Sequence, residues 1–249
     1  MFYEVRKNMR KRVIALDMDG TITQHRTMLE DKNRKVLENL KKKYGVVVVG
    51  AGDWERIDRQ LDVREIDIIG NYGMQIALFN KKNKEFDILK NEVIPVNKEN
   101  IRKRVKMIRE KYGLNDYKGD SVEFHKSGVI TLPILGTKAE VQDKLLFDPD
   151  RKKRKKMYKE IRLAFSEYSV FIGGSSSFDM APYPYDKLCA LETYMKIKGV
   201  RYEDVIYIGD DYGEGGNDNS VYKSEIDFVK IDNYLDFEDI IRAYVLSDE

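Results

Sequence analysis

The sequence predicts an α/β fold: a Rossmann-like core with a parallel sheet, interrupted by an inserted α+β domain. Short apolar runs without alternation, VIAL, VVVV and VIYIG, are typical of strands buried on both faces of a parallel sheet. Amphipathic segments between such runs form βαβ units. The middle of the chain instead suggests paired strands and helices. We therefore predict a core of residues 1–82 and 186–249 and an insertion of residues 83–185.

Composition narrows the class of protein. The 45 basic residues nearly balance the 43 acidic ones, which argues against a dedicated nucleic-acid-binding protein. The single cysteine, Cys189, cannot form an intrachain disulfide and fits a reducing compartment. No run approaches the ~20 apolar residues of a membrane span, and the four apolar residues before Asp17 are too few for a signal-peptide core. We expect a cytoplasmic protein without a membrane partner.

The first third of the chain predicts two strands that end in polar turns. Asp17 and Asp19 come directly after the strand VIAL and are followed by Gly20 and Thr21. Residues 30–43 have the apolar spacing of an amphipathic helix, and the valine strand after them ends in the turn Gly50-Ala51-Gly52-Asp53. A helix beginning near Trp54 could bind a phosphate at its N-terminus. Residues 66–73 predict a further strand and turn.

The middle of the chain has a different pattern. It predicts a hairpin over 77–89, a helix over 97–113, two strands about the turn at 125–128, and a helix over 148–165 with Asp148 as N-cap. The basic run from Arg151 to Lys156 could indicate binding to nucleic acid. The balanced net charge favours a solvated helix face instead.

The α/β pattern then returns. A helix carries Cys189, which we expect to be a small buried apolar side chain. The strand VIYIG that follows ends in Asp210 and Asp211 and a glycine-rich turn, and residues 224–246 predict a last strand and a terminal helix.

Three strand ends thus carry the same kind of chemistry: DMDGT, GAGD and GDDYGEGGND, with Lys187 between the last two. The carboxyl ends of parallel strands meet at one edge of a sheet, where ligands bind. Carboxylate oxygens suit Mg²⁺, and glycine-rich turns expose N–H groups to phosphate oxygens. The sequence therefore predicts a shared metal and phosphate site.

This ordered set of motifs resembles the haloacid dehalogenase superfamily of phosphoryl-transfer enzymes. The α+β insertion resembles the large cap domain of one subgroup, and within it the chain is similar to the eukaryotic-type phosphomannomutases nearly end to end. The stretches that carry the similarity are VVGAGDWERIDRQL, the turn Glu123–Gly128, IGGSSSFDMAP, DKLCAL and IGDDYGEGGND.

The resemblance implies roles for the motif residues. Asp17 would be the nucleophile that forms an aspartyl-phosphate, and Asp19 the general acid and base. Lys187 would neutralise charge on Asp17 and the phosphoryl oxygens. Mg²⁺ would be held by Asp17, the backbone carbonyl of Asp19 and Asp210, with Asn217 and Asp218 supporting the metal shell.

The resemblance also implies a substrate site, with departures from the family pattern. Phosphate would bind at the turn Gly50-Ala51-Gly52, where Gly52 replaces a serine that binds the transferring phosphate. Of the arginines that grip the distal phosphate, only Arg26 is kept. His125, Thr137 and Lys144 stand at three arginine positions of the cap, and Ser177 and Asp179 match positions that bind phosphate and sugar hydroxyls.

These departures bear on function. Histidine, threonine and lysine are not equivalent to a bidentate guanidinium, so the second phosphate site of a mutase would be weakened. We therefore expect a Mg²⁺-dependent phosphatase of a phosphorylated sugar or related small metabolite. The alternatives are a phosphomannomutase or phosphoglucomutase that interconverts hexose 1- and 6-phosphates, and a catalytically weakened phosphate-binding protein. The resemblance also allows a homodimer through the cap.

Overall fold

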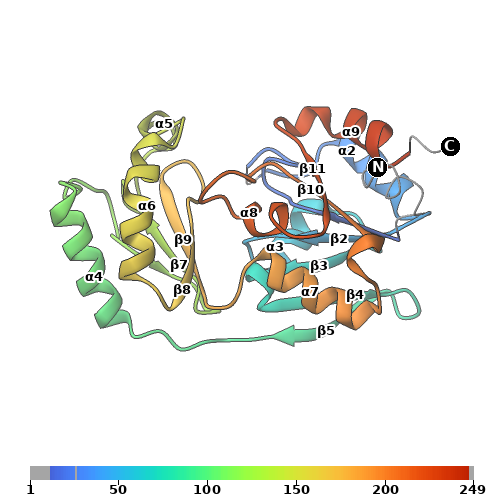
Figure 1. Cartoon of the computed structure of the whole chain (residues 1–249), viewed down its shortest axis with the longest axis horizontal. Helices are drawn as coiled ribbons and strands as arrows, with labels where there is room; N and C mark the ends of the chain where they lie inside the picture. The colour runs from blue at the N-terminus through green and yellow to red at the C-terminus, as the bar shows by residue number, and fades with distance from the viewer. Residues whose placement is uncertain (1–11, 26, 247–249) are drawn as a thin grey trace. The chain divides into compact units, whose positions relative to one another are not determined.

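The computed structural model describes residues 12–25 and 27–246. These residues form two compact units. The first runs to Asn91 and resumes over Lys187–Gly213 and from Asp218, and the second comprises Glu92–Asp186 with the loop Glu214–Asn217 (Figure 1). The chain thus leaves the first unit once for a long insertion and once for a short loop.

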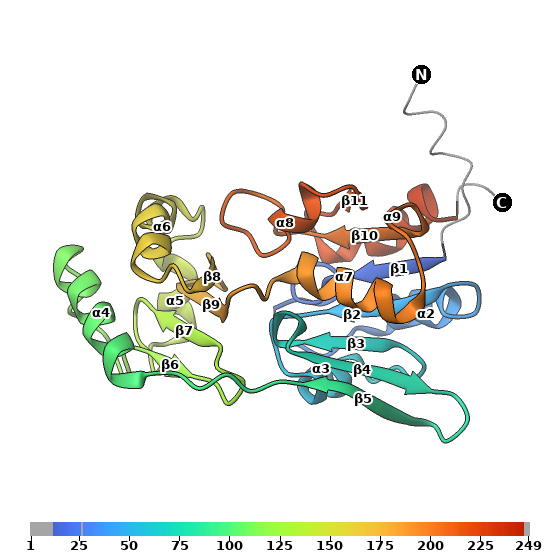
Figure 2. The ribbon, with the colours of Figure 1, turned by 60° about the horizontal axis from the view of Figure 1, so that its bottom comes forward.

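A seven-stranded sheet forms the centre of the first unit. Its strands are β1 (Val13–Leu16), β2 (Gly45–Val49), β3 (Asp67–Gly70), β4 (Gln75–Asn80), β5 (Glu85–Asn91), β10 (Val205–Gly209) and β11 (Asp227–Lys230). Their order is β11-β10-β1-β2-β3-β4-β5, as Figure 2 shows. The strands from β11 to β3 are parallel, whereas β4 and β5 are antiparallel. The predicted parallel core is confirmed.

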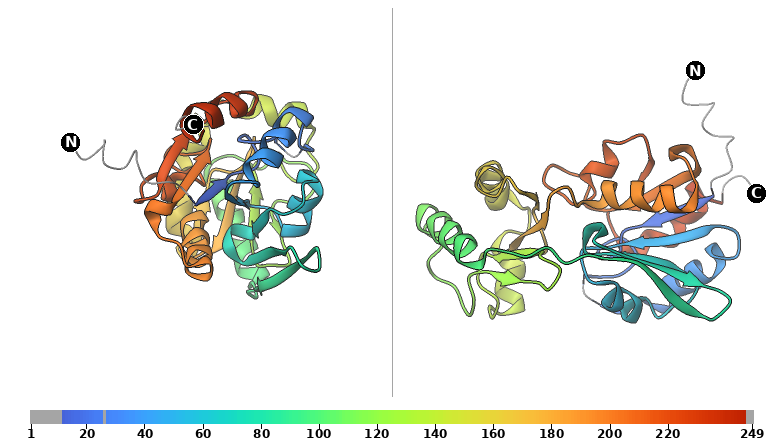
Figure 3. Two further views of the ribbon diagram at one scale, coloured as in Figure 1. Left: turned by 90° about the vertical axis from the view of Figure 1, so that its right-hand side faces the viewer. Right: turned by 90° about the horizontal axis from the view of Figure 1, so that it is seen from below.

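Helices cover both faces of this sheet, which explains the unbroken valine run of β2. The helices are α2 (Asp31–Leu40), α3 (Trp54–Leu61), α7 (Lys187–Lys198), α8 (Asn219–Tyr222) and α9 (Phe237–Tyr244). Val46 and Val48 pack with α2, α3 and α9, while Val47 and Val49 pack with α7 and α8. Figure 3 shows α7 on one side of the sheet and α2 and α3 on the other. Successive valines of the strand therefore point alternately into the apolar clusters on the two faces of the sheet.

The hairpin predicted over 77–89 exists, but it belongs to the first unit. It consists of β4 and β5, and β4 pairs with β3 through Ile68 and Ala77. The change of pattern near residue 76 therefore marks the antiparallel edge of the core sheet. In the structure the first unit extends to Asn91, beyond the predicted boundary at residue 82.

The second unit is an antiparallel sheet with two long helices on one face. Its strands are β6 (Glu123–Phe124), β7 (Ile130–Pro133), β8 (Tyr168–Phe171) and β9 (Ser177–Pro182), in the order β6-β7-β9-β8. Side chains of α4 (Lys98–Lys111) and α6 (Lys152–Ala164) share one apolar cluster with this sheet. A short exposed helix, α5 (Val141–Phe147), was not predicted from the sequence. The predicted α+β character of the insertion is present.

Single 3₁₀ turns complete the described chain: η2 (Asn71–Gly73), η3 (Tyr202–Asp204) and η4 (Tyr234–Asp236). Cys189 in α7 is partly exposed, so the prediction of a buried thiol was wrong. Among the described residues, no helix combines the length and apolar character needed to cross a bilayer.

The basic run at the start of α6 contains a buried ion pair. Arg154 and Asp148 are 1% and 2% exposed, and Arg154 Nε lies 3.0 Å from Asp148 Oδ2. Arg154 also donates to the carbonyls of Gly173, Gly174 and Ser177, and so ties α6 to the loop before β9. The solvated face predicted for residues 151–156 is therefore wrong for Arg154.

The predicted N-cap at Asp148 needs a correction as well. Helix α6 begins at Lys152, with Arg151 at the N-cap. A turn separates Asp148 from the helix, yet its carboxylate accepts the backbone N–H of Lys153 at 2.8 Å and of Arg154 at 3.0 Å. Asp148 thus satisfies first-turn donors from outside the helix.

Replacing Arg154 by methionine is expected to destabilise the second unit. The variant leaves the Asp148 carboxylate buried without its ionic partner, and the loss of one partner of a buried pair costs about 3–5 kcal/mol. Urea denaturation of Arg154→Met measures this loss. The matched control is Lys156→Met on the exposed part of α6, for which a change within about 0.5 kcal/mol is expected. Equal stability of the two variants would contradict the conclusion that the ion pair of Arg154 and Asp148 is buried and stabilising.

The same pair predicts a pH dependence. Burial alone would raise the pKa of Asp148, but the N–H groups of Arg154 and Lys153 and the charge of Arg154 hold this pKa below its usual value. A lowered folded-state pKa stabilises the fold above the unfolded value, near ~4, and the contribution is lost as the pH falls further. We expect the stability difference between wild type and Asp148→Asn to be largest at pH 7 and to narrow below pH 4 in urea titrations. If the stability difference between the two proteins were the same at every pH, the lowered pKa of Asp148 would not contribute to stability.

Candidate active site

Three neighbouring parallel strands bring the predicted motifs to one edge of the core sheet. Strand β1 lies between β10 and β2, and all three run in the same direction. Asp17 follows β1, Gly50 follows β2 and Asp210 follows β10. Residues separated by nearly the whole chain therefore end side by side.

Lys187 is the centre of the polar cluster at this edge. It is the first residue of α7 and is fully buried. Its Nζ atom lies 2.5 Å from Asp17 Oδ1 and 2.7 Å from Asp218 Oδ1. Asp218 also accepts the Tyr207 hydroxyl at 2.6 Å and the backbone N–H of Asp211 at 3.0 Å. One ammonium group thus bridges two buried carboxylates.

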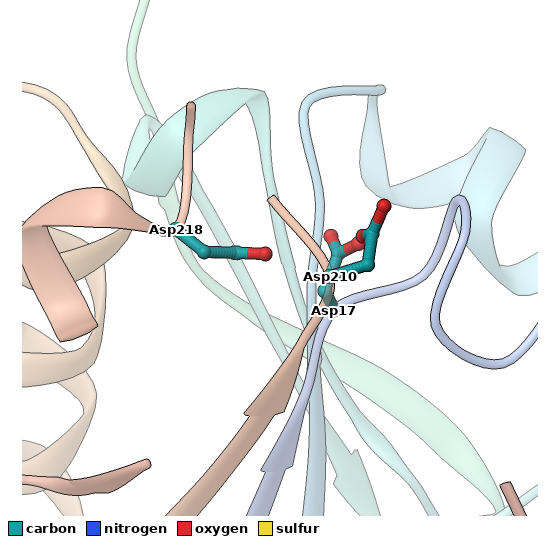
Figure 4. Close-up of side chains that lie close together, drawn as sticks. All are labelled: Asp17, Asp210 and Asp218. Carbon is teal, nitrogen blue, oxygen red and sulfur yellow. The ribbon is translucent and has the colours of Figure 1, made fainter. Parts of the chain in front are cut away.

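A third carboxylate, Asp210, completes the cluster. One carboxylate oxygen from each of Asp17, Asp210 and Asp218 lies within 4.8 Å of the others. Figure 4 shows Asp17 and Asp210 side by side at the ends of their strands, with the Asp218 side chain pointing toward them. The Thr21 hydroxyl lies 3.3 Å from Asp17 Oδ2 and 3.2 Å from Asp210 Oδ1, so it can donate its one proton to either.

Glycine is required where backbone approaches these carboxylates. Gly20 has a φ of +102°, and a Cβ there would lie 2.4 Å from Asp210 Oδ2. A Cβ at Gly209 would lie 2.5 Å from Asp218 Oδ2. The glycines of DMDGT and GDD therefore admit the carboxylates to the site.

Burial and mutual repulsion shape the protonation of the cluster. Burial raises the pKa of Asp17 well above its usual value, the charges of Asp218 and Asp210 add to the rise, and Lys187 opposes it. Burial and the charge of Asp218 likewise raise the pKa of Asp210. Burial would lower the pKa of Lys187, but Asp17 and Asp218 raise it, so the ammonium stays charged.

The donor set fits a hard divalent cation. If all three carboxylates are ionised, the one ammonium leaves two negative charges uncompensated in a buried position. Carboxylate oxygens are the ligands that Mg²⁺ prefers, and a divalent charge would offset the repulsion that raises the pKa values of Asp17 and Asp210. Asp17, Asp210 and Asp218 are therefore the residues that would hold the ion.

Asp19 lies outside this group of three carboxylates. Its Oδ2 accepts the Arg56 guanidinium at 2.8 Å, and its backbone forms a bridge with Thr23. A carboxylate outside this group, two residues from Asp17, suits a proton donor and acceptor, and the predicted binding of Mg²⁺ by the backbone carbonyl of Asp19 stays a prediction. Arg56, on α3, was not predicted as a site residue.

The turn after β2 offers backbone donors. Among the described residues, the N–H groups of Ala51 and Gly52 donate to no acceptor. The carbonyls of Gly50 and Gly52 accept the N–H groups of Tyr72 and Asn71, at 3.3 and 2.7 Å. These two residues adopt positive φ angles of 56° and 48°, so a conformationally costly turn supports the predicted phosphate-binding loop.

In the second unit, the structure links two of the predicted substrate residues. Thr131 Oγ1 donates to Asp179 Oδ1 at 2.9 Å and lies 3.1 Å from His125 Nε2. Because the Thr131 proton is given to Asp179, His125 must be the donor to Thr131. Ser177 donates its hydroxyl to the carbonyl of Gly173.

The other two arginine positions in this unit are occupied by residues that bond to their own chain. Thr137 Oγ1 accepts the backbone N–H of Asp120 at 2.9 Å. Lys144 Nζ donates to the carbonyl of Thr137 at 3.4 Å. Neither is arranged like a bidentate guanidinium.

The roles given to the predicted site residues stay predictions, including those of Arg26 and Asn217. Arg26 lies outside the described residues. Asn217 belongs to the short loop Glu214–Asn217 that groups with the second unit, so its role near the metal remains a prediction.

Comparison with known proteins gives the family. The model of the eukaryotic phosphomannomutase family matches residues 33–233. The chain belongs to the eukaryotic phosphomannomutase family. It is 29% identical over 225 residues to the phosphomannomutase of Encephalitozoon cuniculi, covering 85% of this chain and 84% of that protein. The resemblance to this family inferred from the motifs is therefore confirmed.

Solved structures support the fold. An IMP-bound, N-terminally truncated IMP-nucleotidase of Plasmodium falciparum is similar with a TM-score of 0.70 and 14% identity, over 99% of this chain and 74% of that one. A haloacid dehalogenase-like hydrolase of Bacteroides thetaiotaomicron is similar with a TM-score of 0.55 and 15% identity, over 94% of this chain and 100% of that one. This phosphomannomutase family member thus has the haloacid dehalogenase fold.

Addition of Mg²⁺ is expected to stabilise the protein through the three carboxylates. At a roughly hundredfold excess over Kd, binding adds about 2.7 kcal/mol, which raises Tm by about 5–10 °C. Differential scanning fluorimetry should show this rise in wild type and most of it lost in Asp210→Asn. The control Asp116→Asn, at an exposed position of the second unit, should behave like wild type. An unchanged shift in Asp210→Asn would contradict the assignment of the metal site.

Proposed function

We propose that the protein is a Mg²⁺-dependent phosphoryl-transfer enzyme that acts on a phosphorylated sugar through an aspartyl-phosphate. The observation that carries the proposal is the fully buried Lys187 bridging Asp17 and Asp218. A buried lysine kept charged between carboxylates provides fixed positive charge where a phosphoryl group would meet the nucleophile. Family membership supports the same class of reaction.

The residues divide the chemistry as follows. An Asp17 oxygen attacks phosphorus, and the bond from phosphorus to the sugar oxygen breaks. Asp19 gives its proton to that leaving oxygen and later accepts one from the oxygen nucleophile that attacks the aspartyl-phosphate. That second attack breaks the bond to Asp17 and restores its carboxylate. Mg²⁺, when bound, supplies positive charge that reduces repulsion between Asp17 and the phosphate.

We further propose that water is the final acceptor, so that the enzyme is a phosphatase. The support comes from the second unit, where Thr137 and Lys144 are engaged with their own backbone and His125 with Thr131. A mutase must retain a sugar bisphosphate while it reverses its orientation, which calls for a strong second phosphate site. Bidentate arginines supply such a site, and these three residues do not.

The second candidate is a hexose phosphomutase. Family membership and the relatives named phosphomannomutase favour it. In that reaction the acceptor for the aspartyl-phosphate is a hydroxyl of the sugar phosphate, while Asp17, Asp19 and Lys187 keep the same roles.

A phosphomonoester panel with Mg²⁺ tests the proposal. We expect sugar phosphates to release inorganic phosphate, and Asp17→Asn to lower the rate by at least ~10³-fold, since removal of a nucleophile has effects of this size or larger. Asp116→Asn serves as the control with unchanged rate. Efficient conversion of mannose 1-phosphate to mannose 6-phosphate with a bisphosphate activator and little free phosphate would establish the mutase instead. A panel without turnover, with Asp17→Asn identical to wild type, would refute both.

A further inference from the structure

Gly52 leaves room that a neighbouring arginine fills. A Cβ at position 52 would lie 3.1 Å from both Cζ and Nη1 of Arg56 and 3.2 Å from its Nε. Contacts of this length are tight, so the guanidinium would have to move by a few tenths of an ångström to accept them. The side chain of Arg56 therefore occupies the space next to the turn where the family pattern places a serine hydroxyl.

The guanidinium is held in place from two sides. Nε donates to Gln60 Oε1 at 2.8 Å, and Gln60, which is 8% exposed, donates in turn to the carbonyl of Thr27 at 3.0 Å. Nη2 donates to Asp19 Oδ2 at 2.8 Å. The helix itself is fixed by Asp53, which accepts the backbone N–H of Arg56 at 2.9 Å.

One end of the guanidinium has donors to spare. Within the described part of the chain, Nη1 has no hydrogen-bond partner, and it is among the atoms nearest the empty Cβ position of Gly52. The N–H groups of Ala51 and Gly52 are also without acceptors there. The Arg56 side chain is 30% exposed, so a ligand can reach it.

We propose that Arg56 is a phosphoryl-binding residue that replaces the missing serine of the Gly52 turn. The inference rests on the proposed function. Nη1 and the N–H groups of Ala51 and Gly52 together bind oxygens of the transferring phosphoryl group, while Nη2 holds Asp19. A charged guanidinium binds phosphate oxygens more strongly than a hydroxyl does. Glycine at position 52 lets the guanidinium lie this close to the turn, because a Cβ there would make tight contacts with it.

Calorimetry with tungstate, a phosphate-like oxyanion, in the presence of Mg²⁺ tests whether Arg56 and the Gly52 turn bind phosphoryl oxygens. We expect Arg56→Ala to weaken tungstate binding by ~10- to 100-fold, in line with the loss of a charged hydrogen bond. Arg56→Gln, which keeps the size and neutral donors, should lose less. The matched control is Arg59→Ala, an exposed arginine of the same helix, which should bind as wild type does.

A double-mutant cycle separates this role from a purely structural one. Gly52→Ser alone should weaken tungstate binding, because the serine crowds the guanidinium and shifts it from its position beside the turn. In the Arg56→Ala background the same substitution should restore binding about tenfold, because the hydroxyl then has room and supplies a donor. The KM for the sugar phosphate should rise wherever tungstate binding weakens, when wild type, the two single variants and the double variant are compared.

The inference would be overturned if Arg56→Ala bound tungstate as tightly as wild type, or if wild type bound no tungstate. It would also be overturned if Gly52→Ser changed tungstate binding equally in the wild-type and Arg56→Ala backgrounds. Unchanged binding with a lower kcat would mean that Arg56 only orients Asp19. Urea denaturation of each variant checks that it is folded. If wild type released no phosphate from any substrate but bound tungstate in an Arg56-dependent way, the proposed function would fail and the inference would stand.

Discussion

The ion pairs of Lys187 organise the core. This one ammonium group contacts Asp17 after β1 and Asp218 beside β10, and it starts the helix that covers one face of the sheet. Burying two carboxylates without such a partner would cost several kcal/mol. The arrangement therefore depends on β1 and β10 being neighbours, on glycines that admit the carboxylates, and on a helix that begins at the correct depth. With its carboxylates ionised, the same cluster has an excess of negative charge, which is the property that makes it suited to a divalent cation.

The parts of the fold that could be predicted are those in which local pattern and burial agree. The valine run of β2 faces apolar clusters on both sides, so its lack of alternation correctly indicates a parallel sheet with two helical layers. The hairpin β4–β5 was placed in the wrong unit because a hairpin pattern specifies its own turn and not the strand it joins. Its attachment to β3 depends on long-range pairing. The sequence predicts a surface position for Arg154, because its buried partner, Asp148, precedes the helix across a turn that has no periodic signal.

The same distinction applies to the site. Asp17 and Asp210 were predicted because each follows a strong strand signal, and Asp218 because the motif GDDYGEGGND resembles that of a known family. Tyr207 was missed because its hydroxyl reaches Asp218 from inside a strand that is otherwise apolar, where a tyrosine is an ordinary core residue. Thr21 lies within the DMDGT motif, but its bond to Asp210 could be seen only once two distant strand ends were placed together. Arg56 was missed because an arginine on an amphipathic helix has the composition of a solvated face.

The departures from the family pattern concern proposed ligand contacts rather than Asp17 and Lys187. Gly52 removes a hydroxyl, but the space it frees is filled by a guanidinium that also holds Asp19. In the second unit, the positions of distal arginines carry a histidine linked through Thr131 to Asp179 and two residues bonded to the backbone. Charge is thus present beside the turn that follows β2, and the second unit lacks bidentate cations at those three positions. A monophosphate needs one strongly cationic phosphate site and a bisphosphate needs two, and the proposal that the enzyme is a phosphatase rests on this difference.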